Sequence, residues 1–118
     1  MATIVPLKIT EDGVDGSLTA CGGGGDEFTN TGVEFIRITN EHASTTYTVT
    51  VTAQTTNYYL PRYGKLTKSN TTDTVSAGNT IFLGPFRPSV WNDANDRVQV
   101  TYNAVTDLKI EVLYLEQK

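Results

Sequence analysis

Threonine and apolar side chains alternate along Thr46-Tyr47-Thr48-Val49-Thr50-Val51-Thr52-Ala53, the clearest periodic stretch of the chain. Successive side chains of a β-strand point to opposite faces, so this stretch has one apolar face and one hydroxyl-bearing face. The same period of two recurs over residues 97–103, 108–115, 33–39, 80–83 and 3–9. Turn-forming residues separate these stretches at short intervals, and no helical period appears. The pattern therefore predicts an all-β fold: a single antiparallel β-sandwich, jelly-roll-like, with seven or eight strands.

The two ends of the chain carry strands with special features. In the 108–115 strand, Leu113 and Leu115 make the outward face apolar as well, so we expect a chain terminus or a neighbouring chain to cover its end. Pro6 cannot donate a ladder hydrogen bond, which confines the 3–9 strand to a sheet edge or a bulge. Both ends are therefore candidates for pairing with another polypeptide by edge-strand addition.

Length and composition exclude several classes of protein. The chain has 118 residues, of which 38% are apolar and 19% charged, and threonine is the most frequent residue. This is one domain's worth of chain, 1–118. No apolar run reaches the roughly 20 residues of a membrane span, and the single Cys precludes an internal disulfide. A net charge of −4 argues against sequence-independent nucleic-acid binding. The Met1–Ile9 segment lacks a secretion signal, which indicates a cytosolic site of synthesis.

Two segments do not read as strands. Residues 22–25 are four glycines, expected to form a flexible surface loop. A phosphate-binding role does not suit them, because Asp26 and Glu27 follow where a helix and a Lys are needed. Residues 58–68 form a long aromatic and basic connection. That connection suits a protein interface, intradomain packing, or stacking on single-stranded nucleic acid.

Acidic residues offer two candidate chemistries. Calcium ligands can come from Asp12 with Asp15 or from Asp93 with Asp96, although neither pair completes a calcium loop and Asp commonly initiates turns. Glu34 and Glu111 are carboxylates that can meet in space as in a glycosidase, although no motif marks them.

The chain has one histidine and one cysteine. His42 lies in a polar loop expected to connect two strands as a hairpin, and we expect its side chain to be exposed. Cys21 has no cationic neighbour that would lower its pKa, so it reads as a small spacer. We predict that the protein is not an enzyme and holds no metal or cofactor.

Residues 82–93 form the most distinctive segment, Phe-Leu-Gly-Pro-Phe-Arg-Pro-Ser-Val-Trp-Asn-Asp. Phe86, Val90 and Trp91 place large apolar area in a connection between strands. They either cap the end of the sandwich or anchor a neighbouring protein. The residues expected to form a protein interface are Tyr58, Tyr59, Arg62, Tyr63, Phe86, Arg87, Trp91, Leu113 and Leu115.

The order of several short motifs resembles a family. The motifs are Phe28 to Asn40, Thr48 to Gln54, Pro61 to Thr67, Ala77-Gly78, Leu83 to Phe86, Trp91 to Asp93 and Val98 to Tyr102. Together they cover most of the chain between Phe28 and Leu113. This arrangement resembles the small threonine-rich β proteins encoded among the virion genes of tailed bacteriophages. The glycine run and Tyr58-Tyr59 are not parts of the pattern.

The resemblance implies a structural role on the virion. Such proteins are capsid decoration or cement proteins, or related head components, with a β-sandwich fold. It implies binding to the assembled major capsid protein or other virion proteins, a homo-oligomer with a trimer favoured, assembly in the host bacterial cytoplasm, and a final place on the capsid surface. Two alternatives stay open: a neck or tail component, and a carbohydrate- or cell-surface-binding module with Tyr58, Tyr59, Tyr63 and Trp91 as a stacking platform.

Overall fold

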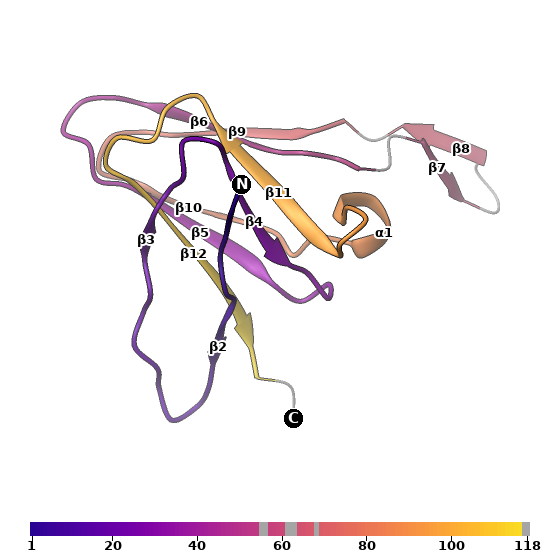
Figure 1. Cartoon of the computed structure of the whole chain (residues 1–118), viewed down its shortest axis with the longest axis horizontal. Helices are drawn as coiled ribbons and strands as arrows, with labels where there is room; N and C mark the ends of the chain where they lie inside the picture. The colour runs from indigo at the N-terminus through magenta and orange to yellow at the C-terminus, as the bar shows by residue number, and fades with distance from the viewer. Residues whose placement is uncertain (55–56, 61–63, 68, 117–118) are drawn as a thin grey trace.

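The computed structural model of the chain consists of two five-stranded β-sheets packed face to face, with a separate two-stranded hairpin (Figure 1). It describes residues 1–54, 57–60, 64–67 and 69–116, and the side chains of these residues apart from those of 57–60 and 64–67. The all-β sandwich expected from the sequence is confirmed, and the sheets do not close into a barrel.

Sheet A is built around the two most regularly alternating stretches. Its strands, in spatial order, are β1 (Ala2–Thr3), β4 (Asp26–Thr29), β11 (Arg97–Tyr102), β6 (Tyr47–Val51) and β9 (Thr71–Val75). Its pairings are antiparallel except that β1 runs parallel to β4.

Sheet B is built around the long C-terminal strand. Its strands are β10 (Thr80–Leu83), β5 (Phe35–Asn40), β12 (Leu108–Leu115) and β2 (Leu7–Ile9), and β3 (Thr19–Ala20) also pairs with β12. The β2–β12 pairing is parallel, whereas the β3, β5 and β10 pairings are antiparallel. The remaining elements are β7 (Asn57–Leu60) with β8 (Gly64–Thr67), and the single-turn helix α1 (Pro88–Trp91).

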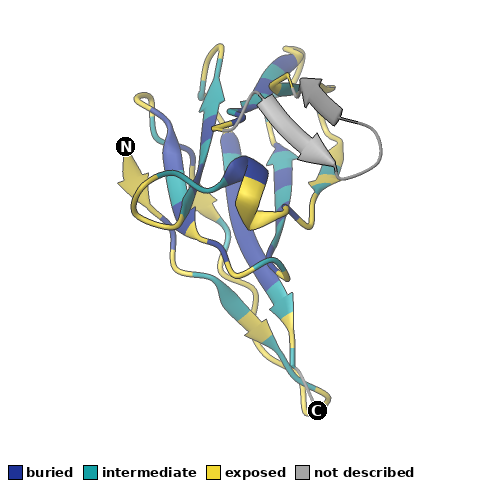
Figure 2. Cartoon of the chain, turned by 90° about the vertical axis from the view of Figure 1, so that its right-hand side faces the viewer, coloured by how far each residue is buried: buried dark blue, intermediate teal, exposed yellow. Residues whose placement is uncertain are grey.

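The core lies between the two sheets and follows the period of two. Sheet A contributes Val49, Val51, Val98 and Val100, and sheet B contributes Ile36, Ile38, Leu108 and Ile110, all fully buried (Figure 2). The alternate threonines Thr48 and Thr50 are half-buried on the outer face of β6. The burial of branched side chains from both sheets in one layer is the main stabilising contribution to the fold.

The number of longer strands agrees with the seven or eight strands expected from the sequence. Seven strands of four or more residues make up sheets A and B: β4, β5, β6, β9, β10, β11 and β12. The short strands β1, β2 and β3 add to the edges. The expected purely antiparallel pairing therefore holds for the long strands, and the parallel pairings come from the N-terminal segment.

Two sequence-based expectations about connections are wrong. Residues 58–68 were expected to be a strandless connection, but β7 and β8 pair over Asn57↔Thr67 to Leu60↔Gly64 as an antiparallel hairpin. The loop around His42 was expected to join neighbouring strands, but β5 lies in sheet B and β6 in sheet A. The fully buried Asn40 fixes this crossover, because its amide donates to the carbonyls of Thr45 at 2.7 Å and Val75 at 3.0 Å.

Candidate assembly surface

The N-terminal segment crosses from one sheet to the other. β1 lies at the edge of sheet A, β2 lies at the edge of sheet B, and the chain passes between them through Ile4, Val5 and Pro6. The predicted effect of Pro6 is confirmed, because it lies in the break between two edge strands rather than inside a ladder. Ile4 is buried in the core at this crossing and donates its N–H to the Glu27 carbonyl at 2.8 Å.

Beyond this crossing the chain forms a narrow projection, which we call the arm: residues 7–18 together with 113–116. Figure 2 shows it extending away from the body of the sandwich to the C-terminus. β2 pairs with β12 over Leu7↔Leu113 to Ile9↔Leu115, and the Glu116 N–H donates to the Ile9 carbonyl at 2.9 Å. The N-terminal segment thus lies along the edge of β12, whereas the outward face expected to be covered is buried at Leu113 and open at Leu115.

The arm exposes apolar side chains although it lies outside the main core. Leu115 is 57% exposed, Val14 in the loop between β2 and β3 is also exposed, and Val5 at the base is 82% exposed. Leu7 and Ile9 are half-buried along β2. A slender extension with apolar side chains gains little from its own packing, so this surface is suited to burial against another polypeptide.

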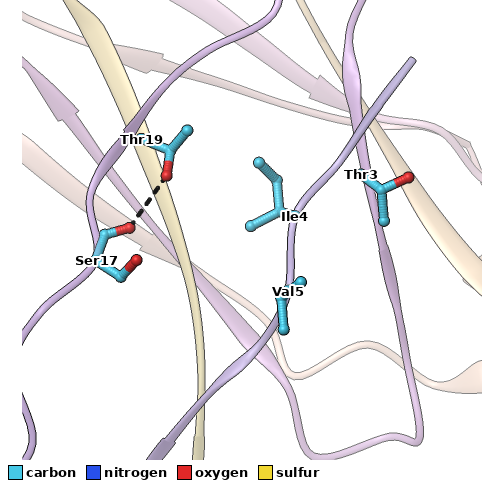
Figure 3. A pocket seen from close by; sticks show the side chains of 5 residues that line it. All are labelled: Thr3, Ile4, Val5, Ser17 and Thr19. Atoms are coloured by element: carbon cyan, nitrogen blue, oxygen red, sulfur yellow. Dashed lines mark hydrogen bonds between the residues drawn. The ribbon is translucent and has the colours of Figure 1, made fainter.

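A pocket lies at the base of the arm. It has a volume of about 260 Å³ and is lined by Thr3, Ile4, Val5, Ser17 and Thr19 (Figure 3). The Thr19 hydroxyl donates to the Ser17 carbonyl at 3.3 Å on one wall. The lining offers methyl groups and hydroxyls but no titratable side chain. The pocket therefore suits a small apolar or amide side chain rather than acid–base chemistry.

The buried carboxylate of Glu111 fixes the arm to the body. The Glu111 carboxylate on the outer face of β12 accepts a hydrogen bond from the Ser17 N–H and pairs with the Arg37 guanidinium of β5 at 3.2 Å. Glu111 is buried, and a buried carboxylate is costly without such partners. Glu111, a candidate catalytic carboxylate from the sequence, is therefore engaged in holding the 16–18 segment.

The predicted interface residues occupy different environments. Leu115 and Arg87 are exposed, whereas Leu113, Phe86 and Trp91 are buried within the single chain. Tyr58 and Tyr59 lie on β7, where the structure describes the backbone alone, and Arg62 and Tyr63 lie outside the described residues. Among the predicted residues with described side chains, Leu113 and Leu115 share the arm.

Phe86, Val90 and Trp91 cap one end of the sandwich. Phe86 packs against Phe28 at 6.2 Å and against Trp91 at 5.7 Å between ring centroids, and Trp91 is only 7% exposed. The alternative that these side chains project as an anchor does not fit their burial. The same burial removes Trp91 from a sugar-stacking platform. Asn30 supports the cap, because its amide donates to the Phe86 carbonyl at 2.9 Å.

The glycine run ends in a buried polar group that the sequence did not reveal. Asp26, expected only to repel phosphate, is almost fully buried; its Oδ2 accepts from the Tyr102 hydroxyl at 2.7 Å and the Gly22 N–H at 3.0 Å. Burial, the largest cause, and the charge of Asp26 raise the pKa of Cys21 to about 12, against an opposing hydrogen bond with Tyr102 that lowers it. Cys21 is therefore a structural thiol, in agreement with its interpretation as a spacer.

The other candidate chemical residues also serve local structure. Asp93 accepts from the N–H groups of Asn95 at 2.8 Å and Arg97 at 3.1 Å, and its hydrogen bond with Gln99 is the main cause that lowers its pKa. Glu34 accepts from the Thr31 N–H at 2.7 Å. In the part of the chain that the structure describes, no three His, Cys, Asp or Glu residues group as a metal site.

His42, predicted to be exposed, is half-buried in its loop. Its Nδ1 accepts from the N–H groups of Ser44 and Thr45, each at 3.1 Å, and its ring meets Tyr47 edge-on at 6.0 Å. His42 thus stabilises the crossover between the sheets.

Comparisons with protein-family models, with curated proteins and with solved structures find no match to this chain. Within the described residues, no helix has the length and apolar character needed to cross a membrane.

Proposed function

We propose that the protein is a non-enzymatic structural component of a tailed-phage virion: a decoration or cement protein that binds the assembled head and stabilises it. The observation that carries this proposal is the arm, a projection anchored to the sandwich that exposes apolar side chains among its polar and charged ones. Its exposed Leu115 and Val14, with Val5 at its base, offer a surface for a neighbouring polypeptide. The motif order from Phe28 to Leu113 is what directs the proposal to virion proteins.

The structural engagement of the candidate reactive residues also supports a non-enzymatic role. The candidate reactive residues Cys21, His42, Asp93, Glu34 and Glu111 are each engaged in holding a loop or strand. Repeated copies on one shell multiply weak individual contacts, so a small arm is sufficient for stable decoration.

Heads assembled from the major capsid protein of the same genome, without this chain, provide the test. Purified protein should bind such expanded heads to saturation and raise their melting temperature. Leu115→Asp should weaken this binding at least tenfold, because it places a charge in an apolar contact. Ala104→Asp, in an exposed loop at the other end of β12, is the matched control and should bind as the natural chain does.

Two results would overturn the proposal. One is the absence of binding to heads at tens of micromolar protein. The other is equal binding by the Leu115→Asp and Ala104→Asp variants, which would exclude the arm as the contact. Counting copies in intact particles separates placements: hundreds of copies indicate the shell, whereas about a dozen or fewer indicate the neck or tail.

A further inference from the structure

The strand β10 is the outermost strand of sheet B and has one open edge. It pairs with β5 over Thr80↔Thr39 to Leu83↔Ile36, and no other described strand pairs with it. Open edges carry unpaired N–H and C=O groups, and soluble proteins usually block them with charges, proline or bulges. β10 has none of these devices along its length, since its sequence is Thr-Ile-Phe-Leu.

The outer strands β9 and β2 differ from β10 in this respect, and the remaining strand at the end of a sheet, β1, is only two residues long. β9, at the edge of sheet A, carries Asp73 at its centre, and β2, at the other edge of sheet B, carries Lys8. Around β10, by contrast, no residue from Ser76 to Phe86 is charged. Phe82 lies in the middle of this uncharged stretch and is 62% exposed.

The register with β5 identifies which backbone groups of β10 face outward. The Asn40 N–H donates to the Asn79 carbonyl at 3.0 Å and the Asn40 carbonyl accepts from the Gly78 N–H at 2.9 Å, so Asn40 of β5 directs both groups toward the β10 side. Because hydrogen-bonded pairs alternate in antiparallel ladders, Ile81 and Leu83 direct their N–H and C=O groups toward β5. Thr80 and Phe82 therefore direct theirs toward the open edge.

We propose that β10 pairs with β10 of a second copy of this chain, antiparallel about a two-fold axis at Ile81. This register places Thr80 of each copy opposite Phe82 of the other. Each of these two equivalent pairs exchanges both of its backbone hydrogen bonds. The same faces of the two sheets meet across this pairing. Ile81 lies on the inner face of sheet B, where it packs against the core, and Phe82 lies on the outer face.

Self-pairing is favoured over a different partner by symmetry and charge. An isologous contact needs a segment that complements itself, and the outward groups of Thr80 and Phe82 satisfy each other in a two-fold arrangement. The two Phe82 rings lie diagonally across the axis, within reach of aromatic contact. The charged neighbour Arg37 is already paired with Glu111, so two chains of net charge −4 meet without unpaired like charges on the described strands.

This inference rests on β10 alone and stands apart from the proposed role on a virion. Sedimentation equilibrium of the full chain should show a monomer–dimer equilibrium. Phe82→Lys, which brings two ammonium groups together at the axis, should weaken the dimer at least tenfold. Val33→Lys is the matched control, since Val33 is also exposed and apolar but lies in the loop before β5; it should dimerise as the natural chain does.

Cross-linking tests the register. In Ile81→Cys, the two new thiols face each other in a non-hydrogen-bonded pair, at a separation that a disulfide spans, so oxidation should give a covalent dimer. Leu83→Cys, two residues along, should not give one. The natural Cys21 does not compete, because it is buried.

Three outcomes would overturn the inference. They are a natural chain that stays monomeric at hundreds of micromolar, an oligomer equally affected by Phe82→Lys and Val33→Lys, and equal cross-linking by the Ile81→Cys and Leu83→Cys variants. Circular dichroism of each variant confirms that it is folded before its association is compared.

Discussion

At the scale of single residues, Asp26 is the buried charged group of the fold whose hydrogen bonds are least complete. It is almost fully buried, and its Oδ1 is the one buried side-chain polar atom among the described residues that has no hydrogen-bond partner. Its Oδ2 depends on the Tyr102 hydroxyl at 2.7 Å and the Gly22 N–H at 3.0 Å. Such a group is stable only while these donors stay in place.

Tyr102→Phe removes the stronger of the two donors to Asp26. The free energy of unfolding should fall by about 1–3 kcal/mol, the usual cost of leaving a buried acceptor unsatisfied. Urea unfolding followed by Trp91 fluorescence measures the change. Tyr114→Phe, at a half-buried position near the end of β12, is the control. Equal stability of the two variants would contradict the structural role of the Tyr102 hydroxyl.

Cys21 makes the stability depend on alkaline pH. Its folded pKa is raised to about 12, mainly by burial, whereas an unfolded thiol titrates near about 8.5. The contribution of the thiol is thus fully present below about pH 8.5 and is lost as the pH rises toward the folded value. Unfolding free energies between pH 7 and pH 11 should fall more steeply for the natural chain than for Cys21→Ala. Parallel curves would show that the thiol is already accessible in the fold.

At the scale of elements, Gly25 sets how closely β4 approaches β11. Its φ is +94°, and a Cβ at this position would lie 2.9 Å from the Val100 carbonyl oxygen of β11. Gly23, in the same run, has no neighbour within 4 Å. The glycines of the run therefore differ in role. The packing leaves no space for a side chain at Gly25, whereas a side chain at Gly23 would meet no neighbour.

Gly25→Ala should destabilise the fold by more than about 1 kcal/mol, because the backbone angle and the contact with Val100 are both unfavourable for a side chain. Gly23→Ala should change stability by less than about 1 kcal/mol in either direction. Thermal unfolding of the two variants, compared with the natural chain, measures the difference. A similar loss in both would mean that the run acts as a single flexible loop.

The strands that the sequence predicts are those with several buried residues in alternation. β5, β6, β11 and β12 have this pattern, and β10 is also predicted, although its side chains alternate between exposed and half-buried. β9 was missed because only Val75 of its five residues is buried, and β4 because it begins with a buried carboxylate. Neither strand carries enough apolar periodicity to be recognised locally.

The candidate surface was only partly predictable for a related reason. The apolar outward face near the end of β12 indicated that something covers it, and Pro6 indicated an edge. The contacts that shape the arm and its surroundings join distant residues, Ser17 with Glu111 and Asp26 with Tyr102. No local pattern specifies such pairs, because they depend on how the sheets are assembled.

At the scale of the whole molecule, the two sheets share one core and should unfold together. Trp91 reports on the cap at one end, since it packs on Phe86, which packs on Phe28 of sheet A. Far-ultraviolet circular dichroism reports on the strands of both sheets. Because the cap and the sheets belong to the same buried cluster, urea transitions followed by the two signals should coincide.

The arm is the part of the molecule that should depart from this cooperativity. β2 pairs with β12 alone and lies beyond the main core, so its amides should open by local fluctuations. Hydrogen exchange of the Lys8 amide region should therefore be faster than that of Val98 and Val100, which are fully buried in β11 between two partner strands. Equal protection of β2 and β11 in the isolated chain would show that the arm needs no partner to be stable, which would remove the physical reason for expecting one.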